Sequence, residues 1–301
     1  MRKKFGLIIT CFFISFFSFA QDTTDISKML EEELKVTDKN QIHFITSTFK
    51  TTRLIDGHSV ENTAPGVLDF KISHRFGTFG QGAYELFGLD NATMRMGFDY
   101  GLTNNLMIGI GRSTVLKTFD GFIKWKILRQ STGKRNMPIT LSYVPTLGII
   151  SFKDPAVYKN FSNRVNFTHQ LLIGRKFGEG LSLQLMPTVV HRNLPVDNGP
   201  NDVWALGMGG RQKLSKRTSF NVEYYYQLPE YRVPGSTNVL SVGFDIETGG
   251  HVFQLHVTNS SSMTESSFIT ANKGSWSNGD ILFGFNISRV FTVGKKHTKE
   301  W

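Results

Sequence analysis

The segment Ala92-Thr-Met-Arg-Met-Gly-Phe-Asp-Tyr-Gly-Leu-Thr103 alternates apolar and polar side chains along almost its whole length. Successive side chains of a β-strand point to opposite faces, so a strand here would have one apolar face and one polar face. Methionine, phenylalanine, tyrosine and leucine would share the first face, while arginine, aspartate and threonine would share the second. This pattern predicts a strand that separates an apolar medium from a polar one.

Eleven further segments show the same alternation, although less strictly. We predict strands at residues 67–76, 92–103, 106–114, 120–129, 138–150, 164–177, 181–191, 203–214, 218–228, 239–248, 251–259 and 280–293. Most of these are at least as long as the roughly 9–11 residues that a tilted strand needs to cross a bilayer.

The connections between these segments also alternate in length. Short ones lie at 103–105, 130–137, 177–180, 214–217 and 247–250; mostly longer ones lie at 77–91, 115–119, 151–163, 192–202, 229–238 and 260–279. Bacterial outer-membrane barrels have short periplasmic turns and longer outer loops. The sequence therefore predicts an all-β fold, a transmembrane antiparallel up-and-down β-barrel of about 12 strands, with both ends on the periplasmic side.

Soluble all-β folds show the same alternation and must be weighed. A barrel of this size has an interior too wide for a few side chains to fill, so pointing the apolar face at lipid is the simpler solution. The opposite face is also too rich in charged residues for a soluble core. A soluble sandwich of two sheets remains the alternative.

The N-terminal region divides into an export signal and a short linker. Basic residues 2–4, an apolar run over residues 5–17 and the small residues of Ser18-Phe19-Ala20 predict a signal peptide at 1–20. Cys11, the only cysteine of the chain, lies inside it. Residues 21–62 would form a periplasmic helix over 22–36 and a rim or plug segment, and residues 63–301 the barrel. The predicted location is the outer membrane of a bacterial cell.

The formal net charge is +10, yet the charges are scattered rather than clustered. A nucleic-acid partner would need a basic face, and export makes such a partner still less plausible. The expected partners are the lipid bilayer, with a small polar solute and a periplasmic protein as further candidates.

The polar face of the predicted strands would line the lumen. Its candidate residues are Lys71, Arg75, Arg95, Asp99, Lys124, Lys126, Arg211, Glu223, Asp245 and His256. Because both signs of charge occur, two interpretations stay open: a polar pore, or ion pairs between strands that stiffen and fill the interior.

No constellation of residues predicts catalysis. The histidines lack the spacing of a zinc site, and no nucleophile elbow or phosphate loop is visible, so we expect no enzyme activity, metal or cofactor. His169 falls on the apolar face of its strand without a nearby hydroxyl on that face. We interpret it as a residue that a β-bulge turns inward.

Four stretches resemble a known family when they are taken together. They are Ser47-Thr-Phe-Lys-Thr-Thr-Arg-Leu-Ile-Asp-Gly-His-Ser-Val-Glu61, Ile72-Ser-His-Arg-Phe-Gly77, Leu86-Phe-Gly-Leu-Asp-Asn-Ala92 with Arg95-Met-Gly97, and Gly109-Ile-Gly-Arg112. The chain is similar to an uncharacterised family of exported bacterial β-barrel proteins, a domain of unknown function. The resemblance implies an outer-membrane barrel and no particular activity.

Residues 41–62 could be an extra strand, a lumen insert or a lid. Within them Arg53, Asp56, His58 and Glu61 concentrate polar groups just before the first strand. We consider these four, together with the loop 77–91, as part of a plug or docking surface, with a capped turn at the barrel rim as the other interpretation. The first functional hypothesis is a channel or transporter for small polar solutes. The second is a non-conducting barrel that anchors or docks a periplasmic or surface partner.

Overall fold

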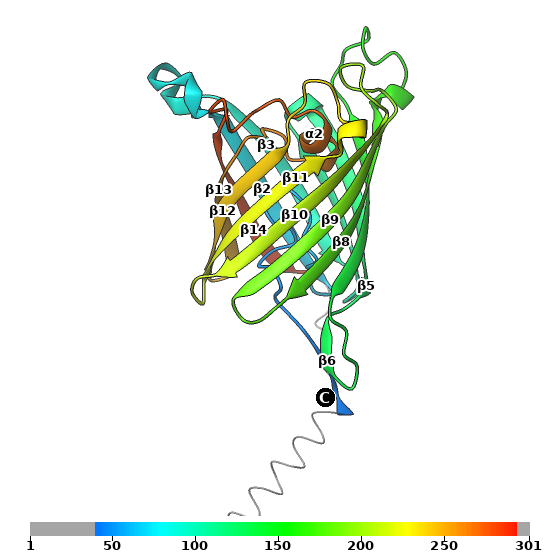
Figure 1. Cartoon of the computed structure of the whole chain (residues 1–301), viewed down its shortest axis with the longest axis vertical. Helices are drawn as coiled ribbons and strands as arrows, with labels where there is room; N and C mark the ends of the chain where they lie inside the picture. The colour runs from blue at the N-terminus through cyan, green and yellow to red at the C-terminus, as the bar shows by residue number, and fades with distance from the viewer. Residues whose placement is uncertain (1–39, 294–301) are drawn as a thin grey trace, which may run out of the picture.

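A computed structural model describes residues 40–293, in which twelve strands close into one antiparallel barrel (Figure 1). The strands are β2 (Val67–Thr78), β3 (Ala92–Gly101), β4 (Leu106–Ser113), β5 (Thr118–Leu128), β7 (Thr140–Ile150), β8 (Val165–Lys176), β9 (Leu181–Arg192), β10 (Asp202–Lys213), β11 (Thr218–Gln227), β12 (Val239–Thr248), β13 (His251–Thr258) and β14 (Leu282–Thr292). The predicted architecture is confirmed. The predicted signal peptide and N-terminal helix lie outside the described residues.

Each barrel strand pairs with the next one along the chain, and β14 pairs with β2 to close the ring. Closure matters because hydrocarbon offers no hydrogen-bond partner to an unpaired strand edge. The connections 102–105, 129–139, 177–180, 214–217 and 249–250 lie at one end, here called the short-turn end. The other connections lie at the long-loop end, although 114–117 there is short.

A small ribbon outside the barrel was not predicted from the sequence. Strand β1 (Ile42–Phe44) pairs with β6 (Ser131–Gly133), which belongs to the connection between β5 and β7. The ribbon extends from the short-turn end of the barrel (Figure 1). Ile42 and Phe44 are exposed on it, and the Arg129 guanidinium lies 4.0 Å from the centroid of the Phe44 ring.

The remaining regular elements are short. A helix, α2 (Glu265–Thr270), and the 3-10 turns η1 (Phe79–Gln81), η2 (Ala83–Gly88), η3 (Val115–Lys117), η4 (Ser162–Arg164) and η5 (Pro229–Tyr231) lie in long-loop connections. Within residues 40–293, no helix has the length and hydropathy needed to cross a bilayer.

The two faces of the wall differ as the alternation predicts. On β3, Met96 and Phe98 are about two-fifths exposed on the outside, whereas Arg95 and Asp99 are buried inside. The lumen is nevertheless less uniformly polar than the sequence suggested. Val144, Leu172 and Met186 also face inward and are fully buried. Part of the lumen is therefore apolar, and these three residues belong to one buried hydrophobic cluster.

The prediction for His169 is wrong. It pairs in regular register with Pro145 and Val189, without a bulge, and its side chain is exposed on the outer face. The Tyr143 hydroxyl lies 2.7 Å from His169 Nδ1. Tyr143 on the neighbouring strand β7 thus gives the imidazole a hydrogen-bond partner, so His169 does not need to turn inward to find one.

The outer face should tolerate charge poorly in the middle of a strand. Met96→Arg should lower the free energy of unfolding by about 2–4 kcal/mol, because it places a guanidinium deep in hydrocarbon. Denaturant titration in phosphatidylcholine vesicles would measure this loss. Leu102→Arg, in the turn after β3, is the control and should cost about 0–1 kcal/mol. Equal losses at both positions would contradict the assigned orientation.

Candidate functional site: a lumen filled by residues 45–64

Residues 45–64, here called the inserted segment, run inside the barrel. The segment enters at the short-turn end, where the Ile45 N–H donates to the Gln130 carbonyl at 2.9 Å. It leaves at the same end, since Pro65 bridges to Gly101 at the end of β3. Every residue from 51 to 60 is buried. The segment therefore fills lumen space instead of forming a turn at the rim.

The inserted segment is a hairpin whose tip is residues 54–57. Arg53 and His58 form an antiparallel bridge, and the Leu54 N–H donates to the Gly57 carbonyl at 2.9 Å. Gly57 is required by space, because a Cβ there would lie 2.0 Å from the hydroxyl oxygen of Tyr225. The tip therefore sits directly against the wall.

Glu223, on β11, receives the backbone donors of the tip. Its carboxylate accepts hydrogen bonds from the N–H groups of Ile55, Asp56 and Gly57 at 2.8, 2.7 and 2.8 Å. Hydrogen bonds to a carboxylate are stronger than those between neutral groups. One wall carboxylate thus satisfies three successive donors that would otherwise be buried without partners.

Wall amides receive the carbonyl groups of the same tip. Gln254 Nε2 donates to the Leu54 carbonyl at 2.8 Å, and Asn286 Nδ2 donates to the Ile55 carbonyl at 2.9 Å. The Asp56 carboxylate accepts from Arg75 Nη2 at 2.7 Å and from the Ser241 hydroxyl at 2.5 Å. The donors of the tip are thus matched by β11 and its acceptors by strands β2, β12, β13 and β14.

Lysine and arginine side chains hold the two arms of the hairpin. Lys124 Nζ donates to the carbonyls of Thr52, Ser59 and Glu61 at 2.9, 2.8 and 3.0 Å. An ammonium group has three donors, so this contact uses all of them. Closer to the short-turn end, Arg211 Nη1 donates to the carbonyls at positions 47 and 48, at 3.1 Å each. Both cations bind backbone and not carboxylates.

A cluster of charges joins the inserted segment to β2 and β3. Lys71 Nζ forms ion pairs with Asp69 and with Asp99, the latter at 2.9 Å. The Thr52 hydroxyl donates to Asp99 Oδ2 at 2.7 Å. A buried charge is costly unless it is paired and hydrogen-bonded, and these partners supply both.

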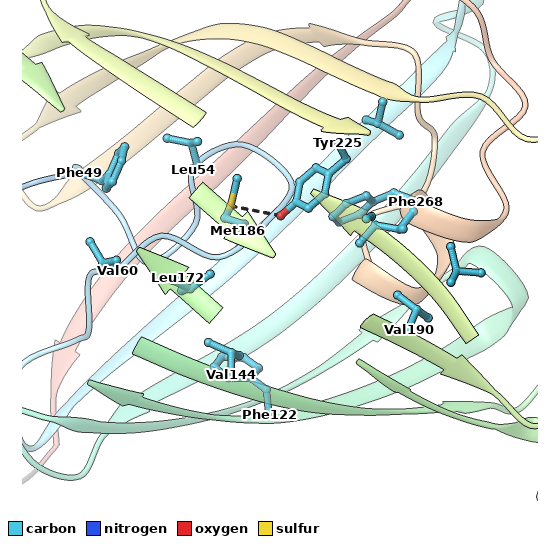
Figure 2. Packing of buried hydrophobic residues seen from close by; sticks show 14 of the residues in the cluster. Phe49, Leu54, Val60, Phe122, Val144, Leu172, Met186, Val190, Tyr225 and Phe268 are labelled. Carbon is cyan, nitrogen blue, oxygen red and sulfur yellow. Dashed lines mark hydrogen bonds between the residues drawn. The ribbon is translucent and has the colours of Figure 1, made fainter. Parts of the chain in front are cut away.

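Apolar packing completes the fit between hairpin and wall. Leu54 lies over Gly209 of β10, where a Cβ would approach Leu54 Cδ2 to 2.0 Å. Figure 2 shows Leu54 near Met186, and Val60 and Phe49 elsewhere along the same inserted chain. Phe49, Leu54 and Val60 of the inserted segment belong to the same buried hydrophobic cluster as Val144, Leu172 and Met186 of β7, β8 and β9.

The long-loop end is filled by the connection between β13 and β14. All six residues of α2 are buried, and α2 lies within the upper opening of the barrel (Figure 1). The Phe268 ring packs edge-on against Tyr225, with 5.0 Å between centroids. Arg192 Nη1 donates to the Ser266 carbonyl at 3.3 Å and to the Thr270 hydroxyl at 3.1 Å.

The inserted segment and the connection between β13 and β14 contact each other through a buried ion pair. Arg53 of the inserted segment pairs with Glu265 at the start of α2. His58 Nε2 lies 3.4 Å from the same carboxylate oxygen. The Glu265 side chain is fully buried, so this contact links a segment from the short-turn end to a loop from the long-loop end.

Only some of the residues predicted from the sequence to face the lumen contact the inserted segment. Lys71, Arg75, Asp99, Lys124, Arg211 and Glu223 contact the inserted segment. Arg95 instead pairs with Asp120, Asp245 accepts from Gln254, His256 lies against Gly284, and Lys126 is half-buried. Of the four inserted candidates, the carboxylate of Glu61 accepts from the Thr48 N–H at 2.7 Å.

Sequence reasoning missed several residues that bind the hairpin. Gln184, Gln254 and Asn286 lie on the polar faces of predicted strands, so strand parity could have found them. The lumen candidates predicted from the sequence are charged residues and one histidine, whereas these three residues are uncharged amides. Glu265 lies in a connection, where no periodicity indicates which way a side chain points.

The family comparison gives the fold a name. Residues 49–291 match the family described as "Membrane bound beta barrel domain (DUF5777)". The chain belongs to this family. The match begins inside the inserted segment, so most of that hairpin is part of the family domain. A search of curated proteins finds no matching sequence.

Solved structures with a similar arrangement are membrane barrels. The KdgM porin is 10% identical with a TM-score of 0.44, covering 75% of this chain and 99% of the porin. Omp33 of Acinetobacter baumannii is 7% identical with a TM-score of 0.41, over 74% and 97%. The CymD monoaromatic hydrocarbon channel is 8% identical with a TM-score of 0.36, over 76% and 89%. Likeness at this level concerns the barrel fold only.

Removing the Glu223 carboxylate should loosen the hairpin tip. Glu223→Ala leaves three buried N–H groups without partners, and each such donor costs about 1–3 kcal/mol, so we expect a loss of at least about 3 kcal/mol. Denaturant titration would measure the free energy of unfolding. Glu247→Ala is the control, because its ion pair with Lys50 at the rim is part-exposed and worth under about 1 kcal/mol. A loss no larger at Glu223 would contradict the proposed contact.

Because Arg53 and Glu265 form an ion pair, substitutions of the two residues should have non-additive effects on the free energy of unfolding. Arg53→Met and Glu265→Gln should each cost about 3–5 kcal/mol, because each leaves a buried charge without its partner. The double variant should cost less than the sum by about 0.5–3 kcal/mol.

The control cycle combines Arg53→Met with Asp202→Asn, whose carboxylate is exposed and pairs with His191. These two changes should be additive in the free energy of unfolding. If the Arg53 and Glu265 changes were equally additive, the two fillings of the lumen would not be coupled.

Proposed function

We propose that this protein is an outer-membrane barrel that does not conduct in its resting state, and that it anchors a periplasmic partner at the membrane. The inserted segment is the observation that carries the first part. Its backbone donors and acceptors are bound by side chains of the wall, including Glu223, Lys124 and Asn286. A pore would leave those side chains facing water.

The ribbon formed by β1 and β6 supports the second part. It connects directly to the inserted segment, because residue 45 follows β1. Its exposed Ile42 and Phe44 offer apolar contact area, with the cation of Arg129 beside it. Under this proposal the short-turn end faces the periplasm, as short turns do in bacterial outer-membrane barrels.

A gated channel for small polar solutes is the second candidate. The contact between hairpin and wall contains many charged and amide groups, whose hydrogen bonds water could replace if the hairpin withdrew. The lumen would then expose Lys71, Arg75, Arg211 and Glu223, which would favour small polar solutes. No metal, cofactor or catalytic step enters either proposal.

Planar-bilayer recording of the refolded full chain tests these proposals. We expect the wild-type protein to give no stable conductance steps, because the inserted segment fills the lumen. Gly209→Leu should produce openings, since even a Cβ at this position would collide with Leu54. Gly210→Leu is the matched control, because the adjacent residue faces the opposite side of β10, and it should stay silent.

Each outcome has a definite meaning. Stable steps from the wild-type protein would overturn the non-conducting proposal. Steps from Gly209→Leu alone would identify the inserted segment as the obstruction, as the proposal expects. Silence from all three proteins, with each shown to be folded, would mean that displacing Leu54 does not open the lumen, which would count against the gated channel.

A further inference from the structure

An apolar projection at the long-loop end has no role in filling the lumen. Residues 79–89, here called the rim knob, connect β2 to β3 through η1 and η2. Five of its large side chains are exposed: Phe79, Tyr84, Leu86, Phe87 and Leu89. Tyr84 is 93% exposed, which is extreme for an aromatic residue in a compact turn.

The rim knob is a built structure with its own internal contacts. The Phe87 N–H donates to the Gly82 carbonyl at 2.8 Å, and the Leu89 N–H donates to the Leu86 carbonyl at 3.2 Å. Gly88 has a φ of +88° and lies so close to Gly77 that a Cβ would approach its carbonyl oxygen to 2.5 Å. The knob is thereby fixed to the end of β2.

Two large residues in the knob have left-handed backbone conformations. Leu86 and Phe87 have φ values of 45° and 54°, although neither is a glycine. Such a conformation is unfavourable for residues with a Cβ and persists only where something compensates for it. Both side chains remain more than half exposed, so contacts within the described protein do not bury them.

Position and chemistry indicate what covers the knob. It leans outward beyond the barrel wall (Figure 1). The outer face of the strands beneath it carries a group of rings: His74 stacks on Phe285 at 5.0 Å, and Phe76 lies 5.9 Å from Phe283. These rings belong to the lipid-facing belt, which continues along β2 to within three residues of Phe79.

The charge of the knob fits an apolar contact. The knob, residues 79–89, contains one acidic residue, Glu85, and no basic one. Aromatic residues of membrane barrels gather at the interfaces between hydrocarbon and water. Apolar side chains held beside that interface gain free energy by entering it.

We propose that the rim knob is a membrane anchor: Tyr84, Leu86 and Phe87 insert into the lipid–water interface of the leaflet at the long-loop end. The anchor extends the lipid contact of the protein beyond the strands and fixes the height of the rim at β2 and β3. It works irrespective of whether the lumen conducts.

Cysteine labelling can test this directly, because Cys11 is the only cysteine of the chain. In a Cys11→Ser background, Tyr84→Cys and Phe87→Cys would be labelled with the environment-sensitive dye NBD and refolded into phosphatidylcholine vesicles. Phe161→Cys is the matched control. Phe161 is also an exposed aromatic residue of a long loop, but the connection between β7 and β8 rises above the rim (Figure 1) and carries Lys153, Asp154 and Lys159.

We expect a blue-shifted NBD emission at positions 84 and 87, with quenching by lipids that carry a doxyl group near the headgroup. Iodide in the water should quench these two labels less than the label at position 161. Heat-modifiable migration in electrophoresis would show that each variant is folded. Adding Leu86→Ser and Phe87→Ser should return the label at position 84 to water.

Two results would overturn the proposal. Equal iodide quenching at all three positions would place the knob in water. Protection from iodide without quenching by doxyl lipids would mean that protein, such as a second copy of this chain, covers the knob instead of lipid.

Discussion

The structure depends on one constraint, which is that no backbone N–H or C=O group can remain unpaired in hydrocarbon. A sheet satisfies this only by closing on itself, and here β14 pairs with β2 to do so. Closure of twelve strands then creates a second problem, because the enclosed space is wider than opposing side chains can fill. The inserted segment and α2 fill that space from opposite ends.

Filling a lumen with chain brings further backbone groups into the interior, and these need partners as well. The wall provides them through side chains. The Glu223 carboxylate accepts hydrogen bonds from three N–H groups, and Lys124 donates hydrogen bonds to three carbonyls. Gln254 and Asn286 donate hydrogen bonds to the carbonyls of the hairpin tip. Several of the charged residues on the polar face therefore bind the backbone of the hairpin. A buried ion pair between Arg53 and Glu265 also connects the inserted segment to α2.

The two faces of each strand contact different surroundings, and this difference also explains the outer surface of the barrel. Met96 and Phe98 contact lipid and need no specific partner, whereas a polar side chain on that face needs a hydrogen-bond partner. His169 illustrates this, since it stays outward and bonds to Tyr143. The rim knob continues the apolar surface past the end of β2. Lipid contact and lumen filling are thus separate tasks, carried by opposite parities of the same strands.

The sequence alone determined the strands, their order and the face of most of their residues, because alternation is a local property of two-residue period. The segment 92–103 and the regular spacing of turns were sufficient for this. The sequence also indicated that Arg53, Asp56, His58 and Glu61 belong together, but left a plug and a rim turn open. Only the tertiary structure decided between them, since the partners of the hairpin lie on strands far apart in the chain. Glu265 and the ribbon of β1 with β6 show the same limit: their contacts are long-range, and no local period encodes them.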